Sequence, residues 1–307
     1  MVDMKSLLTM QAMMFLMILT GAFFRKRGLI TAEGRKSLTN IVVHLILPCN
    51  ILYAFSRADS LLFSSLMAVV IMAVVLQLAW YVLSKVLWKK MPESRRGVMR
   101  YAFQFSNCGF LGNPVIEGLY GSQGLIYASI YLIPIRIFMW SIGLESFQEK
   151  SGSFLETMRK IATHPCILAT AAGVLWMFFP VTLPEFLQNT IYGFNQCLTP
   201  FTMLIIGSIL AEANLKEMFC RDIYVLSLLR LVIQPLIALG LCRMLHLETL
   251  VAEVVTVLVA MPVASTTAIL ASQHDCDATF ASNAVVFTTV LSLITIPLFS
   301  LLVGLVF

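Results

Sequence analysis

Charged residues are scarce in this chain, since only 12% of its 307 positions are Asp, Glu, Lys or Arg. Soluble domains carry about 25% charged and about 45–50% apolar residues, whereas 59% of this chain is hydrophobic. Too little polar surface is left for a protein of this size to face water. The composition therefore excludes an ordinary soluble domain and predicts an integral membrane protein.

The residue spacings of metal centres and redox motifs are also missing. The seven cysteines are scattered without a Cys-x-x-Cys pair, and the four histidines form no zinc-binding spacing. No His/Asp, Ser/Lys or metal constellation falls near the middle of an apolar segment. We therefore expect no metal, no cofactor and no enzymatic activity.

Long apolar segments are what the chain has in abundance. A transmembrane helix needs about 20 mostly apolar residues, because the hydrocarbon core of a bilayer is about 30 Å thick. Little sequence remains between these segments, so no separate soluble domain is expected. We predict an all-α integral membrane protein with ten transmembrane helices near 5–24, 38–56, 61–84, 98–120, 124–147, 162–180, 186–211, 222–245, 249–273 and 279–306.

Basic residues gather at alternate connections between the segments. They concentrate in 25–36, 85–100, 150–160 and 216–221, whereas the opposite connections hold little beyond Arg57 and Arg243. Because cytoplasmic loops carry the excess of Lys and Arg, both termini are predicted to lie outside the cell (inner or plasma) membrane. The basic runs adjoin the ends of the spans, so they indicate orientation in the membrane rather than nucleic-acid binding.

The least hydrophobic connection divides the ten segments five and five. We expect a first five-helix repeat at 1–147, a short cytoplasmic connecting loop at 148–161 and a second repeat at 162–307. An odd number of crossings in each half inserts the second half upside down relative to the first. This is the inverted-repeat plan of many secondary transporters.

Internal prolines occupy corresponding segments of the two halves. Pro48 in the second segment matches Pro200 in the seventh. Pro114 in the fourth matches Pro262 in the ninth at nearly the same offset. Two pairs in register support the inverted repeat and predict interrupted helices in the fourth and ninth segments.

The fourth segment contains Asn107-Cys108-Gly109-Phe110-Leu111-Gly112-Asn113-Pro114. A proline inside a helix removes a hydrogen bond and clashes with the preceding turn, and the glycines lower helix propensity further. Non-helical backbone at membrane depth persists only where it is buried in protein or lines a cavity. We predict a broken helix whose amides near Gly112 and Asn113 hold a carboxylate, with a simple proline kink as the alternative.

The ninth segment places three hydroxyl residues after its proline. Pro262 is followed by Ser265, Thr266 and Thr267, whose hydroxyls either donate to a ligand or bond back to their own helix. Discontinuous helices in corresponding positions of two halves are the best sequence pointer to a transport site. We therefore predict that the two interrupted helices form the substrate site together.

Two arginines lie inside predicted spans. At about 1.5 Å per residue, Arg136 and Arg230 lie roughly 16 and 12 Å from the cytoplasmic ends of their helices. No Asp or Glu of the sequence falls at that depth. Intramembrane charges usually face an interior or a pathway, so a net positive interior suited to an anionic cargo is expected. Each arginine either contacts the substrate or caps carbonyls of a broken helix, and both interpretations stay open.

Several short motifs follow one another in a fixed order. They are Leu47-Pro48, Asn107 to Pro114, Leu119-Tyr120-Gly121, His164-Pro165, Thr199-Pro200 with Met203 and Gly207, Met261-Pro262, and Thr289 to Pro297. In this order, and over essentially the whole chain, they resemble the auxin efflux carrier family. The short stretch at 148–160 stands where plant PIN-FORMED members have a long loop, so the chain is similar to prokaryotic members.

The resemblance implies that the spans form two domains with different roles. Spans 1, 2, 6 and 7 would form a scaffold, and spans 3–5 and 8–10 a transport domain with crossed helices 4 and 9 and an elevator-type motion. In the PIN-FORMED branch, the asparagine seven residues before the crossover proline contacts the substrate carboxylate. Asn107 holds that position relative to Pro114. Prokaryotic members often carry dicarboxylates such as malate or malonate.

The prediction is a secondary-active transporter of small organic anions, such as mono- or dicarboxylates. Its expected partners are a carboxylate substrate, the lipid bilayer and a second copy of the chain through the scaffold domain. A sodium-coupled symporter of the bile-acid type and a non-transporting sensor remain alternatives, and coupling to protons or sodium stays open. The predicted substrate-binding residues are Asn107, Gly112, Asn113, Pro114, Arg136, Pro262, Ser265, Thr266 and Thr267, with Asn50, Gln104 and Arg230 in support.

Overall fold

The computed structural model of the chain describes residues 4–57, 63–147, 159, 162–179, 182–212, 218–274 and 276–307. Throughout these ranges the regular structure is helical, apart from one isolated β-bridge. The predicted connecting loop at 148–161 lies outside the described residues except at position 159. The expected all-α fold class is confirmed for the described chain.

In the first half, short π-helical turns join α-helices into longer rods. Thr31 begins the second rod, because its side chain accepts a hydrogen bond from the N–H of Gly34 over 3.0 Å and so caps the first turn. The elements are α1 (Met4–Lys26), α2 (Ala32–Ile41), η1 (Val42–Ile46), α3 (Leu47–Ser56), α4 (Phe63–Leu87), α5 (Glu93–Gln104), η2 (Cys108–Gly112), α6 (Asn113–Phe138) and η3 (Met139–Gly143).

The second half repeats the alternation of rods and interruptions. Its elements are α8 (Pro165–Phe178), α9 (Glu185–Gln196), α10 (Leu198–Leu210), α11 (Arg221–Leu228), η4 (Leu229–Ile233), α12 (Gln234–Met244), α13 (Thr249–Val259), α14 (Thr266–Gln273) and α15 (Ala278–Val306).

Prolines account for three of the π-helical turns. The segments η1, η2 and η4 each end two residues before a proline, at Pro48, Pro114 and Pro235. A proline has no N–H and its ring crowds the preceding carbonyls, so the helix widens locally where that strain falls. At these three prolines the helix widens, whereas Pro134 and Pro297 are accommodated inside α6 and α15.

Six helical stretches of the described chain are long and apolar enough to cross a membrane. They are Ala32–Ser56, Ser64–Leu87, Cys108–Gly143, Glu185–Leu210, Arg221–Met244 and Ala278–Val306, with the shorter apolar helices Pro165–Met177 and Thr249–Val259 in addition. Large apolar side chains such as Leu16, Val86 and Ile294 are exposed on the outer faces of α1, α4 and α15, where lipid would cover them. These observations make the chain an α-helical, multi-pass membrane protein, and the number of ten spans stays a prediction.

The helix α6 covers the end of the predicted fourth span and most of the fifth. Its two parts meet at Gly121, where the backbone is non-helical (φ 62°, ψ −157°). Residues with a side chain rarely adopt a positive φ, so glycine allows the chain to turn there without a separate loop. The boundary expected between 120 and 124 is therefore a single-residue break.

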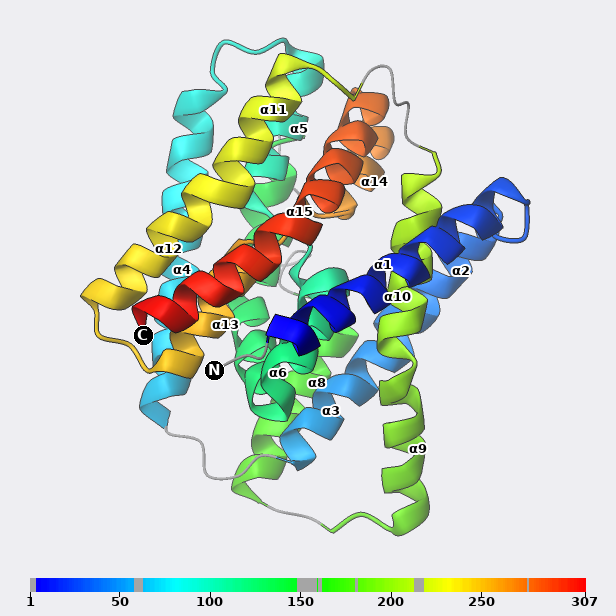
Figure 1. The fold of residues 1–307 in the computed structure, drawn as a ribbon, viewed down its shortest axis with the longest axis vertical. Helices are drawn as coiled ribbons and strands as arrows, with labels where there is room; N and C mark the ends of the chain where they lie inside the picture. Colours follow the sequence, from blue (N-terminus) through cyan, green and yellow to red (C-terminus); the bar gives the residue numbers. More distant parts are fainter. Residues whose placement is uncertain are drawn as a thin grey trace.

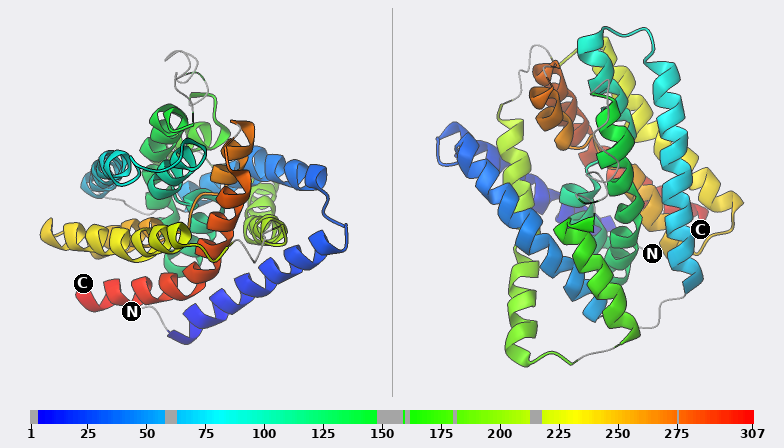
Figure 2. Two further views of the ribbon diagram at one scale, coloured as in Figure 1. Left: turned by 90° about the horizontal axis from the view of Figure 1, so that it is seen from above. Right: turned by 180° about the vertical axis from the view of Figure 1, so that it is seen from behind.

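Two groups of helices pack side by side (Figures 1 and 2). Group I consists of α1, α2, α3, α8, α9 and α10, in which α1 lies along α10 and α3 packs against α8 and α9. Group II consists of α4, α5, α6 and α11 to α15, with α13 packed between α6, α12 and α15. Contacts of α6 with α3 and of α1 with α15 join the groups.

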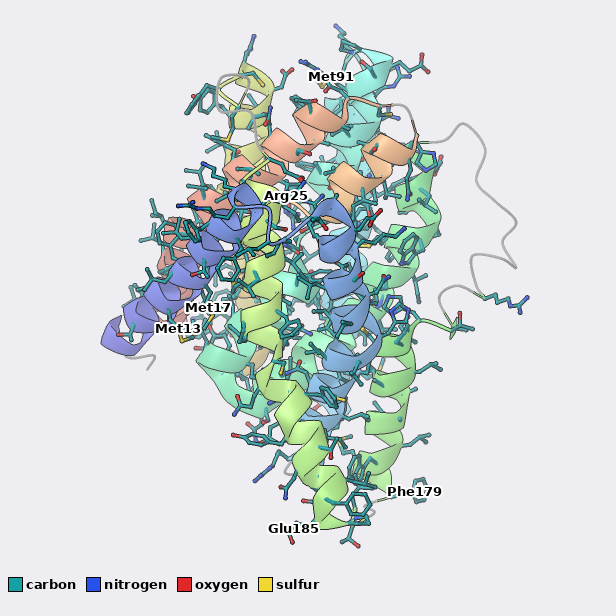
Figure 3. All side chains as sticks on the ribbon, turned by 90° about the vertical axis from the view of Figure 1, so that its right-hand side faces the viewer. Met13, Met17, Arg25, Met91, Phe179 and Glu185 are labelled. Atoms are coloured by element: carbon teal, nitrogen blue, oxygen red, sulfur yellow. The ribbon has the colours of Figure 1, made fainter. Side chains whose placement is uncertain are left out.

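The two ends of the molecule carry different connections. In Figure 3, Arg25 and Met91 lie toward one end, whereas Phe179 and Glu185 lie at the opposite end. The first pair belongs to the basic stretches predicted to be cytoplasmic, and the second pair to the stretch predicted to be outside. The fold therefore separates the predicted sides along its long axis.

Candidate functional site

The interruptions of the two broken helices lie against each other. They form an isolated antiparallel bridge between the segment after α5 and the segment after α13. The N–H of Asn107 donates to the carbonyl of Pro262 over 2.8 Å, and the N–H of Ala264 donates to the carbonyl of Phe105 over 3.1 Å. Each interruption therefore supplies the backbone partners that the other lost on leaving the helix.

Side chains satisfy further backbone groups where the two interruptions, 105–107 and 260–265, meet, a place that we call the crossing. The N–H of Val263 donates to the Thr288 hydroxyl over 3.2 Å. The carbonyl of Leu258, in the last turn of α13, accepts from the Ser106 hydroxyl at 3.3 Å and the Cys108 thiol at 3.2 Å. Non-helical backbone at this depth is thus paired within the protein, as the apolar surroundings of a membrane require.

Arg230 contacts both broken helices beside the crossing and is 2% exposed. Its guanidinium donates to the carbonyl of Phe103 at 3.2 Å, to the carbonyl of Met261 at 3.3 Å and to the side-chain oxygen of Gln234. The Gln234 amide also donates to Phe103 over 2.9 Å. Of the two roles considered for Arg230, its geometry is that of a cap on carbonyls of both broken helices.

A cavity of about 780 Å³ lies between the two groups, beside the crossing. Group II contributes Asn107, Arg136, Ser265 and Thr266 to its wall, and group I contributes residues of α2, η1, α8 and α10. The structure therefore brings together, around one space, four of the residues that the sequence predicts as substrate contacts.

Arg136 is the buried charge of this cavity. It lines the wall while being only 7% exposed. Its Nη1 nitrogen has no hydrogen-bond partner, and no carboxylate forms an ion pair with it, among the residues the structure describes. A buried guanidinium without a counter-charge raises the electrostatic potential of the cavity and favours an anion there.

The two interruptions also place amide and hydroxyl groups on the cavity. The side-chain amide of Asn107 donates to the Ser265 hydroxyl over 3.1 Å, and the Thr266 hydroxyl lies 3.1 Å from that of Tyr101. Asn107 is the N-cap of η2, and Ser265 is the N-cap of α14. Two helical N-termini therefore lie at the same wall of the cavity. The first N–H groups of a helix have no partner within it, so both ends offer backbone donors.

Five of the predicted substrate-binding residues do not line the cavity. Gly112 is buried instead against α13, where an added Cβ would stand 2.9 Å from a methyl group of Leu258. Both polar atoms of the buried Asn113 side chain lack a partner within the described part of the chain. The remaining three are Pro114, Pro262 and Thr267, of which the last is fully buried.

The two supporting amides lie elsewhere. The Asn50 side chain donates to the Glu117 carboxylate over 2.8 Å and to the Asn195 side chain over 2.6 Å, so it joins α3, α6 and α9. Gln104 donates to the Ser84 hydroxyl over 3.1 Å and joins α5 to α4. Both bond between helices, which is the ordinary use of an amide in a membrane protein.

Other residues of the cavity were not predicted as site residues from the sequence. Asn40 of the second rod, with His164 and Cys166 at the start of α8, forms part of the group I wall, which Arg35 and Lys36 also line. Their signals in the sequence are polar residues near the ends of apolar segments, the His164-Pro165 motif and the basic stretch 25–36. The sequence does not state which face of a helix meets a partner far away in the chain, so these residues could not be assigned.

Metal-binding geometry is missing from the described residues, in which no group of three or more His, Cys, Asp or Glu side chains could hold an ion. All seven cysteines are free thiols.

An α-helical, multi-pass membrane protein in which two interrupted helices cross beside a cavity that holds a buried arginine has the architecture of a membrane transporter. Comparison with known proteins gives the family. The model of the family described as membrane transport protein matches residues 7–300, and the chain belongs to this family, that of the auxin efflux carriers.

Two archaeal relatives are similar along nearly their whole length. An uncharacterized transporter of Methanothermobacter thermautotrophicus is 28% identical over 294 residues, which cover 92% of this chain and 94% of the relative. The uncharacterized transporter MJ1031 of Methanocaldococcus jannaschii is 25% identical over 295 residues, with the same coverage of the two chains. The resemblance drawn from the motifs is confirmed.

Proposed function

We propose that this protein is a secondary-active transporter of small organic anions, such as mono- or dicarboxylates, and that the cavity beside the crossing is its substrate site. The observation that carries the proposal is Arg136, a buried guanidinium on the cavity wall that no described carboxylate neutralises. A carboxylate in the cavity would supply the missing counter-charge through charge-assisted hydrogen bonds.

The neighbouring groups support an anion over a neutral cargo. Asn107 and Ser265 present an amide and a hydroxyl as donors, and each begins a helical segment. Helix N-termini carry a partial positive charge and bind carboxylates and phosphates through their free N–H groups. We assign Asn107, Ser265 and Arg136 to carboxylate binding, with Thr266 on the same wall.

Basic residues add to the field of the cavity. Arg35 and Lys36 line it together with Glu212, whose carboxylate forms ion pairs with Arg25 and Arg35 at 2.6 Å each. The three positive charges of Arg25, Arg35 and Lys36 exceed the single negative charge of Glu212, so this region is net positive, which raises the local concentration of anions. Since 25–36 is a predicted cytoplasmic stretch, we take the cavity to open to the cytoplasm, with both termini outside.

The packing of the helices supports an elevator-type motion. Group I corresponds to spans 1, 2, 6 and 7 and would be the scaffold, and group II corresponds to spans 3–5 and 8–10 and would carry the substrate. Ten crossings in two inverted repeats, 1–147 and 162–307, complete the proposal. The crossing belongs wholly to group II, so a bound carboxylate would move with it past the group I wall. A homodimer through group I would hold the scaffold still.

The decisive experiment is flux of labelled carboxylates into liposomes that contain the purified protein. We expect uptake of an anion, and we expect Arg136→Gln to slow it at least about tenfold, the loss of one charge-assisted hydrogen bond. Arg243→Gln is the matched control, because Arg243 is an exposed arginine of α12 outside the cavity wall. Unchanged flux in Arg136→Gln, or flux restricted to neutral or cationic solutes, would overturn the proposal.

Two arms of the same experiment address the alternatives. Uptake that depends on an imposed sodium gradient would identify the symporter mechanism, and uptake that depends on a proton gradient would identify proton coupling. A protein that binds carboxylates in the absence of any flux would be a sensor, which contradicts the transport proposal.

A further inference from the structure

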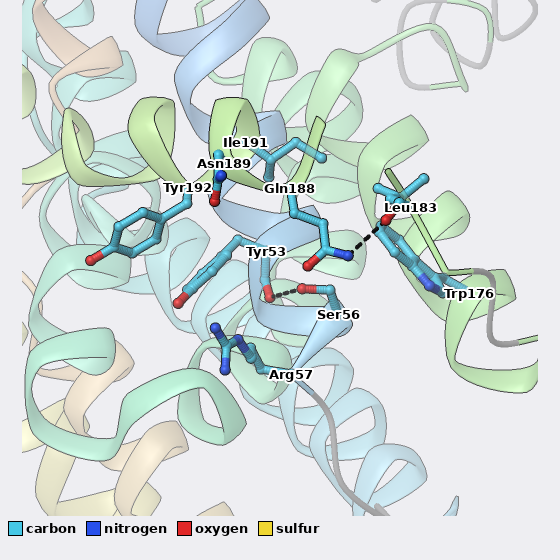
Figure 4. A pocket seen from close by; sticks show the side chains of 9 residues that line it. All are labelled: Tyr53, Ser56, Arg57, Trp176, Leu183, Gln188, Asn189, Ile191 and Tyr192. Atoms are coloured by element: carbon cyan, nitrogen blue, oxygen red, sulfur yellow. Dashed lines mark hydrogen bonds between the residues drawn. The ribbon is translucent and has the colours of Figure 1, made fainter. Parts of the chain in front are cut away.

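A second cavity, of about 320 Å³, lies at the other end of group I (Figure 4). It is formed where α3 ends at Ser56, where the apolar part of α8 ends at Met177 and where α9 begins at Glu185. None of its lining residues belongs to the wall of the transport cavity. It is therefore a separate site, at the ends of three apolar helices.

The wall of this second cavity is polar and aromatic and carries one charge. Arg57 is exposed, and its guanidinium lies 5.5 Å from the ring centroid of Tyr53. The Tyr53 and Tyr192 rings pack with centroids 5.3 Å apart, and Figure 4 shows Arg57 beside this pair. No Asp or Glu stands among the lining residues, all of which are described, so the cavity suits an anionic group.

The Arg57 guanidinium is held in place by an aromatic ring and forms no ion pair with a described carboxylate. Its cation–π contact with Tyr53 holds it at the cavity, while no ion pair of Arg57 occurs within the described ranges. Gln188 extends the polar wall and donates its amide to the carbonyl of Leu183 over 2.8 Å, a contact drawn as a dashed line in Figure 4. Among the described residues, the cavity thus combines one cation that forms no ion pair with a polar wall.

Apolar side chains continue from the cavity along the outside of the protein. Leu175, Phe179 and Phe186 are 61%, 71% and 68% exposed on α8, at its C-terminal end and on α9. Tyrosine and tryptophan, here Tyr192 and Trp176, are the residues that concentrate at the interface between lipid and water. A ligand with an anionic head and apolar tails matches both parts of this surface.

We propose that this cavity binds an anionic phospholipid, with the phosphate of its headgroup at Arg57 and its acyl chains along the exposed apolar residues of α8 and α9. A soluble phosphate or carboxylate would use the cation and leave the apolar surface unused. Because 57 and 182–185 belong to connections predicted to be outside, the lipid would belong to the outer leaflet. It would join α3 to α8 and α9 and so stiffen group I.

The test uses the full chain, purified in detergent and stripped of lipid. Thermal denaturation measures its melting temperature, and native mass spectrometry detects the lipids that remain bound. We expect phosphatidylglycerol to bind and to raise the melting temperature more than phosphatidylcholine does. Arg57→Gln should weaken phosphatidylglycerol binding about fivefold to tenfold, the contribution of one basic residue to binding an anionic lipid. Arg57→Lys should retain part of it, which shows that the variant has folded and that charge matters.

Arg243→Gln is the matched control, since Arg243 is also exposed, lies at a predicted outer connection and stacks on a ring, that of Phe307 at 5.9 Å. It should bind phosphatidylglycerol as the unaltered protein does. Equal binding of phosphatidylcholine, equal binding by Arg57→Gln, or full competition by soluble glycerol phosphate at the same concentration would each overturn the proposal.

Discussion

The backbone N–H of Asn107 donates to the carbonyl of Pro262 over 2.8 Å, although 154 residues separate them in the chain numbering. A proline carbonyl left free by a broken helix thus meets the amide of a residue at the other break. Neither interruption could be satisfied alone at membrane depth. The two broken helices are therefore one structural unit, and changes to either should affect both.

Arg230 should be a stability residue. Arg230→Gln removes the donors to the carbonyl of Met261 and to the side-chain oxygen of Gln234, whereas the carbonyl of Phe103 keeps its bond from Gln234. Each buried acceptor left without a partner destabilises by about 1–3 kcal/mol. We expect the unfolding free energy to fall by roughly 2–4 kcal/mol, measured by thermal denaturation in detergent. Arg136→Gln should change stability far less, because no hydrogen bond to the described backbone is lost. Equal losses in the two variants would contradict this distinction.

Asn107 should discriminate cargo charge. Asn107→Leu removes only hydrogen bonds, whereas Asn107→Asp adds a negative charge to the cavity wall at a similar size. The unaltered protein should bind an anionic cargo most tightly, Asn107→Leu less tightly and Asn107→Asp least. The affinity of Asn107→Asp should be about 10-fold to 100-fold below that of the unaltered protein because of like-charge repulsion. Isothermal titration with the transported carboxylate measures the order. A tighter complex with Asn107→Asp would identify a cationic cargo instead.

Asn50 and Glu117 should be energetically coupled. Their 2.8 Å hydrogen bond joins α3 of group I to α6 of group II. A double-mutant cycle of Asn50→Ala and Glu117→Ala should give a coupling energy of about 0.5–3 kcal/mol. The control cycle pairs Asn50→Ala with Glu145→Ala, since Glu145 bonds instead to Tyr81 and Lys85, and should be additive. Additivity in both cycles would show that the bond does not hold the groups together.

The orientation should be visible by cysteine labelling. In a chain whose seven native cysteines are replaced by serine, Ser37→Cys and Asn189→Cys each place one thiol at an exposed position near opposite ends. An impermeant maleimide should label position 189 in right-side-out vesicles and position 37 only in inverted vesicles. The reverse pattern would place the termini in the cytoplasm.

The sequence by itself determined that the protein lies in a membrane and where its helices break. A charged fraction of 12% leaves no alternative to lipid as the main solvent. Pro114 and Pro262 indicate the two interrupted segments because a proline lacks an N–H, although Pro134 and Pro297 lie inside helices that continue through them. Likewise the four basic connections predict orientation without knowledge of packing. These are properties of composition and of single residues.

Only the tertiary structure decided what the two buried arginines do. Arg136 and Arg230 carry the same charge at similar predicted depth, yet one lines the cavity and the other caps Phe103 and Met261. Their roles depend on which helix face meets segments far away in the chain. The same holds for Gly112, which packs against Leu258. Periodicity states that a residue is inside a helical protein, and only the packing of distant segments states what it faces there.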